Sequence, residues 1–94
     1  MNARITATAQ STPDNVMTNF DLEKLVDTSD EWIQSRTGIV QRHVVTDDEA
    51  SSDISTRIAQ SLIEQRGISS NEIDLIIVGT VTPDHFTPST AALV

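Results

Sequence analysis

One continuous apolar run, Leu75-Ile76-Ile77-Val78, constrains the fold of this 94-residue chain more than any other segment. A run of this length and composition is typical of a strand that is covered on both faces, as in a parallel sheet. Such a strand needs neighbouring strands at both edges and covering layers on both faces, and the rest of the chain supplies few of them. We therefore expect the sequence to be part of a larger α/β fold.

The end of the sequence supports the same expectation. Residues 89–94 have the pattern of the first turns of a helix, and the sequence stops inside that helix. A helix nucleus without its body is unstable alone. Hydrophobic residues make up 37% of the chain and aromatic residues 3%, which is little apolar surface for a self-sufficient core. We expect residues 1–94 to form one partial N-terminal domain, truncated inside a helix.

The composition excludes several classes of function. Six basic against 14 acidic residues give a net charge of −8, which repels nucleic acids and anionic membrane surfaces. The chain has no cysteine, which excludes disulfides, thiolate metal sites and cysteine nucleophiles within it. Its two histidines are too few for a histidine-rich metal site, so we predict no metal. No segment resembles a signal peptide, and we expect a cytoplasmic protein.

Periodicity and capping signals predict an alternation of strands and helices. Strands are predicted at residues 4–9, 39–46 and 75–78, with a turn at 11–15. A short helix is predicted after a cap at Thr18 or Asn19, and a second from the capping box Thr28-Ser29-Asp30-Glu31 through Arg36. The best-defined helix is predicted at 52–66, followed by one helical turn at 69–72, a loop at 81–88 and the helix start at 89.

The only tryptophan lies in the most informative segment. Trp32 and Arg36 are four residues apart, which places them on one face of the predicted helix. An indole beside a guanidinium forms a flat cationic surface that can stack on a purine next to a phosphate. The alternative is that Trp32 is a core anchor and Arg36 a surface charge. Spacing alone leaves both interpretations open.

Other polar groups indicate structure more than chemistry. Asp84-His85 is too small a set for a catalytic dyad or a metal site, and is interpreted as a polar turn. His43 is interpreted as a packing or edge residue of its strand, and residues 47–49 as a solvated acidic turn. Ser51-Ser52 and Ser89-Thr90 are interpreted as helix caps, because the sequence places no base beside them.

A series of motifs in a fixed order identifies a family resemblance that covers the chain from Ile5 to Val94. The motifs are Thr18-Asn19-x-Asp21-Leu22-Glu23-Lys24, Val26-Asp27-Thr28-Ser29-Asp30-Glu31-Trp32-Ile33, Arg36-Thr37-Gly38-Ile39, Arg42-His43, Asp74-Leu75-Ile76-Ile77-Val78, Thr82-Pro83-Asp84 and Pro88-Ser89-Thr90-Ala91. In this order they resemble the N-terminal part of β-ketoacyl-acyl-carrier-protein synthase III, a family of the thiolase superfamily. The resemblance implies a thiolase-like α/β fold, with only the N-terminal portion of its layered αβαβα architecture present.

The resemblance implies a condensing enzyme, an acyltransferase of fatty-acid biosynthesis. Members of the family take an acyl group from acyl-CoA onto a cysteine and join it to malonyl-acyl carrier protein with loss of CO₂. Acyl-CoA is then a substrate and no cofactor is permanently bound. The full-length protein is expected to be a homodimer. By the same resemblance, Trp32 stacks on the CoA adenine, Arg36 packs there or meets a phosphate, and Thr28 hydrogen-bonds nearby.

The resemblance also places Phe86 and Thr87 at the acyl pocket or the dimer contact. Some acetyl-preferring members have Phe at the position of Thr87, so the smaller Thr87 predicts tolerance for longer primers. The family's Cys, His and Asn lie beyond the residues present here, so this chain alone is expected to be inactive. Two alternatives remain: a truncated non-catalytic remnant or CoA-binding module, and another thiolase-fold acyltransferase.

Overall fold

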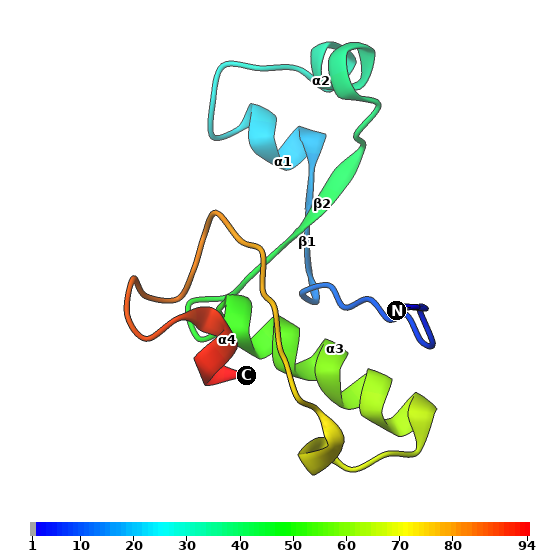
Figure 1. The fold of residues 1–94 in the computed structure, drawn as a ribbon. Helices are drawn as coiled ribbons and strands as arrows, with labels where there is room; N and C mark the ends of the chain where they lie inside the picture. The colour runs from blue at the N-terminus through cyan, green and yellow to red at the C-terminus, as the bar shows by residue number, and fades with distance from the viewer. Residues whose placement is uncertain (1) are drawn as a thin grey trace. The chain divides into compact units, whose positions relative to one another are not determined.

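The structure is a computed structural model that describes residues 2–94 and divides into two compact units. Residues Thr12–Thr46 form one, called here the hairpin unit; residues 2–11 and Asp47–Val94 form the other, the helical unit. The elements, labelled in Figure 1, are β1 (Asn15–Thr18), α1 (Asn19–Glu23), α2 (Asp30–Thr37), β2 (Gln41–Val44), α3 (Ser51–Arg66), the 3-10 turn η1 (Ser70–Glu72) and α4 (Thr90–Leu93).

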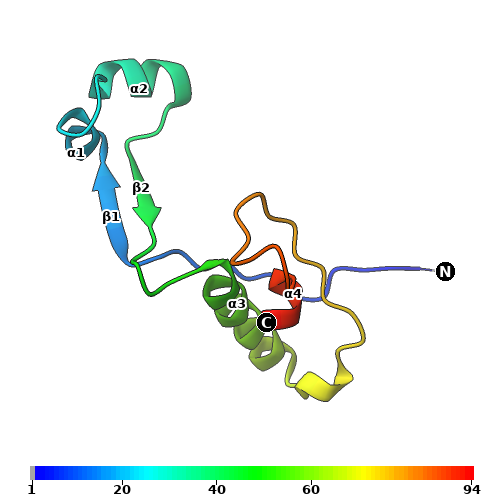
Figure 2. The same ribbon diagram turned by 90° about the vertical axis from the view of Figure 1, so that its left-hand side faces the viewer.

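The hairpin unit is built on two antiparallel strands. β1 pairs with β2 in a register that sets Asn15 opposite Val44 and Thr18 opposite Gln41. Figures 1 and 2 both show α1 and α2 at the same end of this two-stranded ribbon. Two strands alone are marginally stable in water, so the unit depends on what joins the helices to the ribbon.

The start of α1 is fixed by a capping box. The Asp21 backbone N–H donates to the Thr18 hydroxyl (3.2 Å), and the Thr18 backbone N–H donates to Asp21 Oδ2 (2.9 Å). The hydrogen bonds from Thr18, its hydroxyl first and then its backbone N–H, hold the pKa of Asp21 below its ordinary value. The predicted cap at Thr18 is therefore confirmed.

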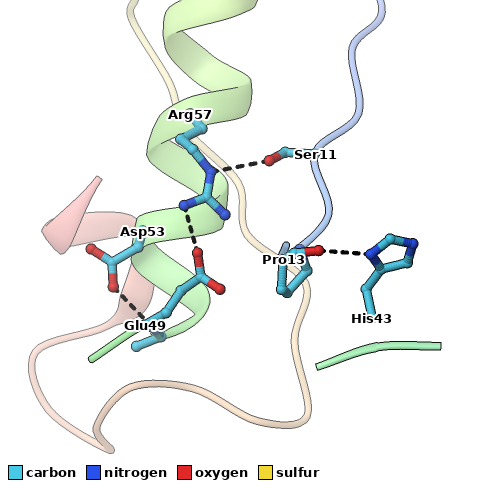
Figure 3. Close-up of polar contacts among 7 residues, drawn as sticks. Ser11, Pro13, His43, Glu49, Asp53 and Arg57 are labelled. Atoms are coloured by element: carbon cyan, nitrogen blue, oxygen red, sulfur yellow. Dashed lines mark hydrogen bonds and ion pairs between the residues drawn. The ribbon is translucent and has the colours of Figure 1, made fainter. Parts of the chain in front are cut away.

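The helical unit is organised by α3, whose predicted range is confirmed to within one residue. Its N-terminus is held from far along the chain, because the Ser52 N–H and hydroxyl both donate to the Asp84 carboxylate. Near the same end, Arg57 donates to Glu49 (2.6 Å) and to the Ser11 hydroxyl (3.1 Å), as Figure 3 shows. The helix ends at Gly67, which has a left-handed φ of 63°.

Two predicted strands are wrong. Residues 4–9 and 75–78 form no strand in the described structure, whose single sheet contains only β1 and β2. A strand is defined by hydrogen bonds to a neighbour, and neither segment pairs with another one here. Leu75 is 74% exposed and Ile77 83% exposed, so the apolar run that suggested a doubly covered strand lies largely uncovered.

Smaller differences concern the ends of elements. β1 was not predicted, because the turn signals at residues 11–15 overlap its first residue and only four residues pair. β2 covers the central half of the predicted strand at 39–46. The helical turn after Ser69, the loop at 81–88 and the helix after Ser89 are confirmed.

The buried core within residues 2–94 is very small. Ile33 is the only buried hydrophobic side chain there, and the other buried residues are polar, Asn19 and Thr90. α3 has no buried residue, although Ile58, Leu62 and other apolar side chains of its inner face are partly covered. The fold therefore leaves most of its large apolar side chains in contact with solvent.

From this distribution we expect the isolated chain to melt over a broad temperature range, without a cooperative transition, and to bind the dye ANS strongly. Replacing Leu75 and Ile77 together by Ser should reduce ANS binding at least about twofold and leave the helical circular dichroism nearly unchanged, because neither side chain is buried. Val81→Ser, at an exposed valine outside the run, should leave ANS binding unchanged. A sharp calorimetric transition of the monomer would contradict this expectation.

Candidate functional site

The site predicted around Trp32 is built on α2. The Ser29 hydroxyl accepts from the Trp32 backbone N–H (3.1 Å), so Ser29 is the N-cap and the capping box expected one residue earlier, at Thr28, is wrong. The helix ends at Gly38, which has φ 72° and donates from its N–H to the Gln34 carbonyl (2.8 Å). A left-handed residue at this position favours glycine, as predicted.

Trp32 and Arg36 meet on the surface of α2. The Arg36 guanidinium carbon lies 5.9 Å from the centroid of the indole ring, within the range of a cation–π contact. Trp32 is 57% exposed, so it is not a core anchor in this structure. The pair, called here the Trp32–Arg36 platform, presents an aromatic ring and a positive charge to solvent together.

Thr28 lies beside this platform. Asp27, Thr28, Ser29 and Trp32 line an open cavity of about 330 Å³ in front of the α2 N-terminus. The structure therefore brings together Thr28 and Trp32 directly, and Arg36 through its contact with the indole. An aromatic face, a hydroxyl and a guanidinium around one open cavity can hold a flat heterocycle with an adjacent anionic group.

A buried asparagine supports the site from behind. Asn19 is fully buried, and its Nδ2 donates to Asp30 Oδ1 (2.8 Å) and to the Ile39 carbonyl (2.7 Å). Its Oδ1 accepts from Nη2 of Arg42 at 2.6 Å. All three contacts are to residues distant in sequence, so one side chain ties α1 to α2 and to the strand region after it.

Further bonds complete this network. Arg42 also donates from Nη1 to the Met17 carbonyl (3.3 Å), and the Asp30 backbone N–H donates to Glu23 Oε1 (2.7 Å). Gln34 Nε2 donates to Asp30 Oδ2 at 2.8 Å. The bonds from Gln34 and, after it, Asn19 hold the pKa of Asp30 below its ordinary value.

The other predicted site residues lie in the helical unit. Phe86 is fully exposed, and Thr87 beside it is also exposed, in the loop before α4. No bond to the Thr87 side chain is present among the described residues. Both side chains are therefore accessible to solvent in this structure.

Several polar groups interpreted as structural have structural contacts, but Ser51 and Ser52 are not caps, because the N-cap of α3 is Ala50 and both serines lie in its first turn. Asp84 is the remote cap of α3, and the hydroxyl of Ser52 is the main cause that holds its pKa below the ordinary value. His43 donates from Nδ1 to the Pro13 carbonyl (2.7 Å, Figure 3). Glu49 was predicted to be solvated, and this is wrong: it forms an ion pair with Arg57, and only 18% of its side chain is exposed. Residues 2–94 contain no cluster of three potential metal ligands.

Comparisons with known proteins agree with the family resemblance of the sequence. No model of a protein family matches the chain. A relative from Chlorobium phaeovibrioides named beta-ketoacyl-acyl-carrier-protein synthase III is 54% identical over the whole chain, and one of the same name from Xanthomonas campestris is 52% identical over 97% of it. The crystal structure of 3-oxoacyl-acyl-carrier-protein synthase III from Aquifex aeolicus matches 92% of the chain with a TM-score of 0.85 and 48% identity.

The chain corresponds to the N-terminal part of a β-ketoacyl-acyl-carrier-protein synthase III. The synthase III structure from Thermus thermophilus gives the same result, with a TM-score of 0.87 and 43% identity over 97% of the chain. The predicted fold class is confirmed: a thiolase-like α/β fold of which only a part is present. The chain spans 28–29% of the length of these synthase III relatives.

Two findings complete the description of this synthase III segment. Across residues 2–94, none of the helices has both the length and the apolar character that a membrane crossing needs.

Sequence reasoning considered Asn19 only as a possible helix cap and missed its contact with Arg42. Both appear in the quoted motifs, but no local pattern indicates a contact across 23 positions. The contact between Asn19 and Arg42 could have been predicted only by knowing that β1 pairs with β2, which brings the two residues together.

The bonds to Asp30 predict a measurable titration. Because its pKa is lower in the folded than in the unfolded chain, these bonds stabilise the fold at neutral pH, and the stabilisation is lost as the pH falls through the folded-state pKa. Gln34→Ala should raise the pKa of Asp30 toward its ordinary value, as followed by carboxyl ¹³C NMR. Gln60→Ala, at an exposed glutamine of α3, is the control. An unchanged pKa in Gln34→Ala would contradict the dominant role of that bond.

Proposed function

We propose that this chain forms part of the acyl-CoA site of a 3-oxoacyl-acyl-carrier-protein synthase III. The single observation that supports this most is the Trp32–Arg36 platform: an exposed indole with a guanidinium 5.9 Å from its centroid, beside the cavity lined by Thr28. The relatives that match nearly the whole chain carry the name of this enzyme.

The chemistry of the platform suits the nucleotide end of CoA. Trp32 offers a ring face on which adenine stacks, and Arg36 offers a charge for a phosphate. Thr28 supplies a hydroxyl at the edge of the same cavity. These residues bind and orient the substrate, and no step of bond making or breaking is assigned to them.

The proposed reaction of the longer enzyme has two stages. The acyl group passes from the CoA sulfur to a cysteine, and the carbanion formed when malonyl-acyl carrier protein loses CO₂ then displaces that cysteine. The products are CO₂, CoA and a 3-ketoacyl-carrier protein, which starts fatty-acid synthesis. The 94 residues contain no cysteine, so the nucleophile belongs to another part of such an enzyme and the chain alone is inactive.

The remaining parts of the proposal concern the assembled enzyme. Acyl-CoA and malonyl-acyl carrier protein are its substrates, no cofactor stays bound, the enzyme is a homodimer and it acts in the cytoplasm. Phe86 and Thr87 line the acyl pocket or the dimer contact. A second candidate is a CoA-binding module without catalysis, which is supported by the presence of Thr28, Trp32 and Arg36 within the single hairpin unit.

A chimera tests the proposed site. Residues 1–94 replace the matching segment of the Aquifex aeolicus enzyme, and the rate is measured against acetyl-CoA concentration. Trp32→Ala should raise KM for acetyl-CoA about tenfold and change kcat less than about twofold, because base stacking on an aromatic ring contributes about 1–3 kcal/mol.

Phe20→Ala is the matched control for this chimera. Phe20 is a more than half-exposed aromatic residue of α1 that does not line the cavity, and its removal should leave KM unchanged. An equal rise of KM in both variants, or no rise in Trp32→Ala, would show that the platform does not bind CoA. A chimera that binds CoA and produces no 3-ketoacyl product would favour the non-catalytic module.

The small side chain of Thr87 predicts the primer preference. In the same chimera, Thr87→Phe should lower the ratio of kcat/KM for butyryl-CoA to that for acetyl-CoA by about tenfold or more, because each misplaced methylene in a filled pocket costs about 1–3 kcal/mol. Thr82→Phe, in the same loop, should leave this ratio unchanged. Equal ratios for Thr87→Phe and the parent chimera would contradict a role of Thr87 in the acyl pocket.

A further inference from the structure

We propose that Asn19, held by Arg42, is a positioning residue for CoA: its buried amide fixes α2 and thereby sets the direction in which the Trp32–Arg36 platform faces. This inference rests on the proposed function of the platform. Asn19 does not line the cavity beside Trp32, so it would act through α2 and not through the ligand.

The amide of Asn19 holds the segments on both sides of α2. One N–H donates to Asp30, the first residue of the helix, and the other to the carbonyl of Ile39, just beyond the Gly38 cap. Both donors of the amide are thus used, and its oxygen accepts from Arg42. A helix held at its entry and at its exit by one side chain has little freedom to rotate.

α2 has few other contacts that could fix its direction. Of its eight residues only Ile33 is buried, and the others are exposed or half-buried. Apolar packing is non-directional, and one apolar side chain does not define a rotation about the helix axis. Hydrogen bonds are directional, and the start of α2 also donates from the Asp30 backbone N–H to Glu23. The side chain of Asn19 holds the segments at both ends of the helix, so its bonds set where Trp32 and Arg36 lie relative to the β1–β2 ribbon.

Asn19→Asp removes both donors with almost no change in size and sets a second carboxylate against Asp30. In the chimera described above, we expect KM for acetyl-CoA to rise about tenfold and kcat to stay within about twofold. The loss of the two hydrogen bonds that Asn19 donates is expected to cost about 1.4 kcal/mol of CoA binding, which corresponds to a tenfold change in affinity. Asn71→Asp is the matched control, because it adds the same charge at an exposed asparagine of η1.

A swapped pair separates positioning from general destabilisation. Asn19→Asp combined with Asp30→Asn restores the net charge and one N–H···O bond between the two positions in the reverse direction. The amide that Asp30→Asn introduces can still accept from Gln34 through its oxygen. We expect the double variant to recover at least about threefold of the lost KM. Failure of the swap to recover KM would show that Asn19 does not act through its bond to Asp30.

The outcomes distinguish this inference from the proposed function. If the parent chimera does not bind CoA, the proposed function is wrong and the positioning role falls with it. If the parent binds CoA and Asn19→Asp leaves KM unchanged, only the positioning role is wrong. Should Asn19→Asp fail to fold, Arg42→Lys keeps the charge and removes the two-pronged contact to Asn19 and Met17; an unchanged KM in that variant overturns the inference.

Discussion

The hairpin unit depends on the buried side chain of Asn19. A buried polar group without partners would destabilise the fold, and Asn19 avoids this because its amide is satisfied from three directions. Those partners lie on α2, after α2 and on β2. In a unit with one buried hydrophobic residue, a satisfied polar network performs the role that an apolar core has in larger domains.

The helical unit shows the opposite balance. α3 is well formed and capped, yet its apolar face and the run after Ile73 remain partly or largely exposed. The relatives are more than three times as long as this chain, and their matching segments superpose on it closely. Secondary structure here is determined by local signals, whereas the layers of a thiolase-like fold require partners that are distant in sequence.

Helices and most of their ends could be predicted from the sequence, whereas strands that depend on pairing with a distant segment could not. The caps at Thr18 and Gly38 and the extent of α3 follow from side chains within one turn, so their positions could be predicted. The strand at 75–78 has the right residues but no neighbour to bond to. The i, i+4 spacing predicted that Trp32 and Arg36 share one face of a helix. The contacts of the Asn19 side chain were not predicted, because its partners lie 11 to 23 positions away.

The carboxylate of Asp84 caps the N-terminal end of α3 and also holds the loop that carries Phe86. Its two oxygens accept from Ser52, 32 positions earlier, so these bonds close a chain loop that contains the helix and the exposed apolar run. The entropy cost of closing a loop rises only slowly with its length, so this contact costs little more than one that closes a loop of half the length. These bonds attach the loop to the N-terminal end of α3. Because Phe86 follows Asp84 by only two residues, the distance that Phe86 can move is set by this attachment to the helix and not by the exposed segment before the loop.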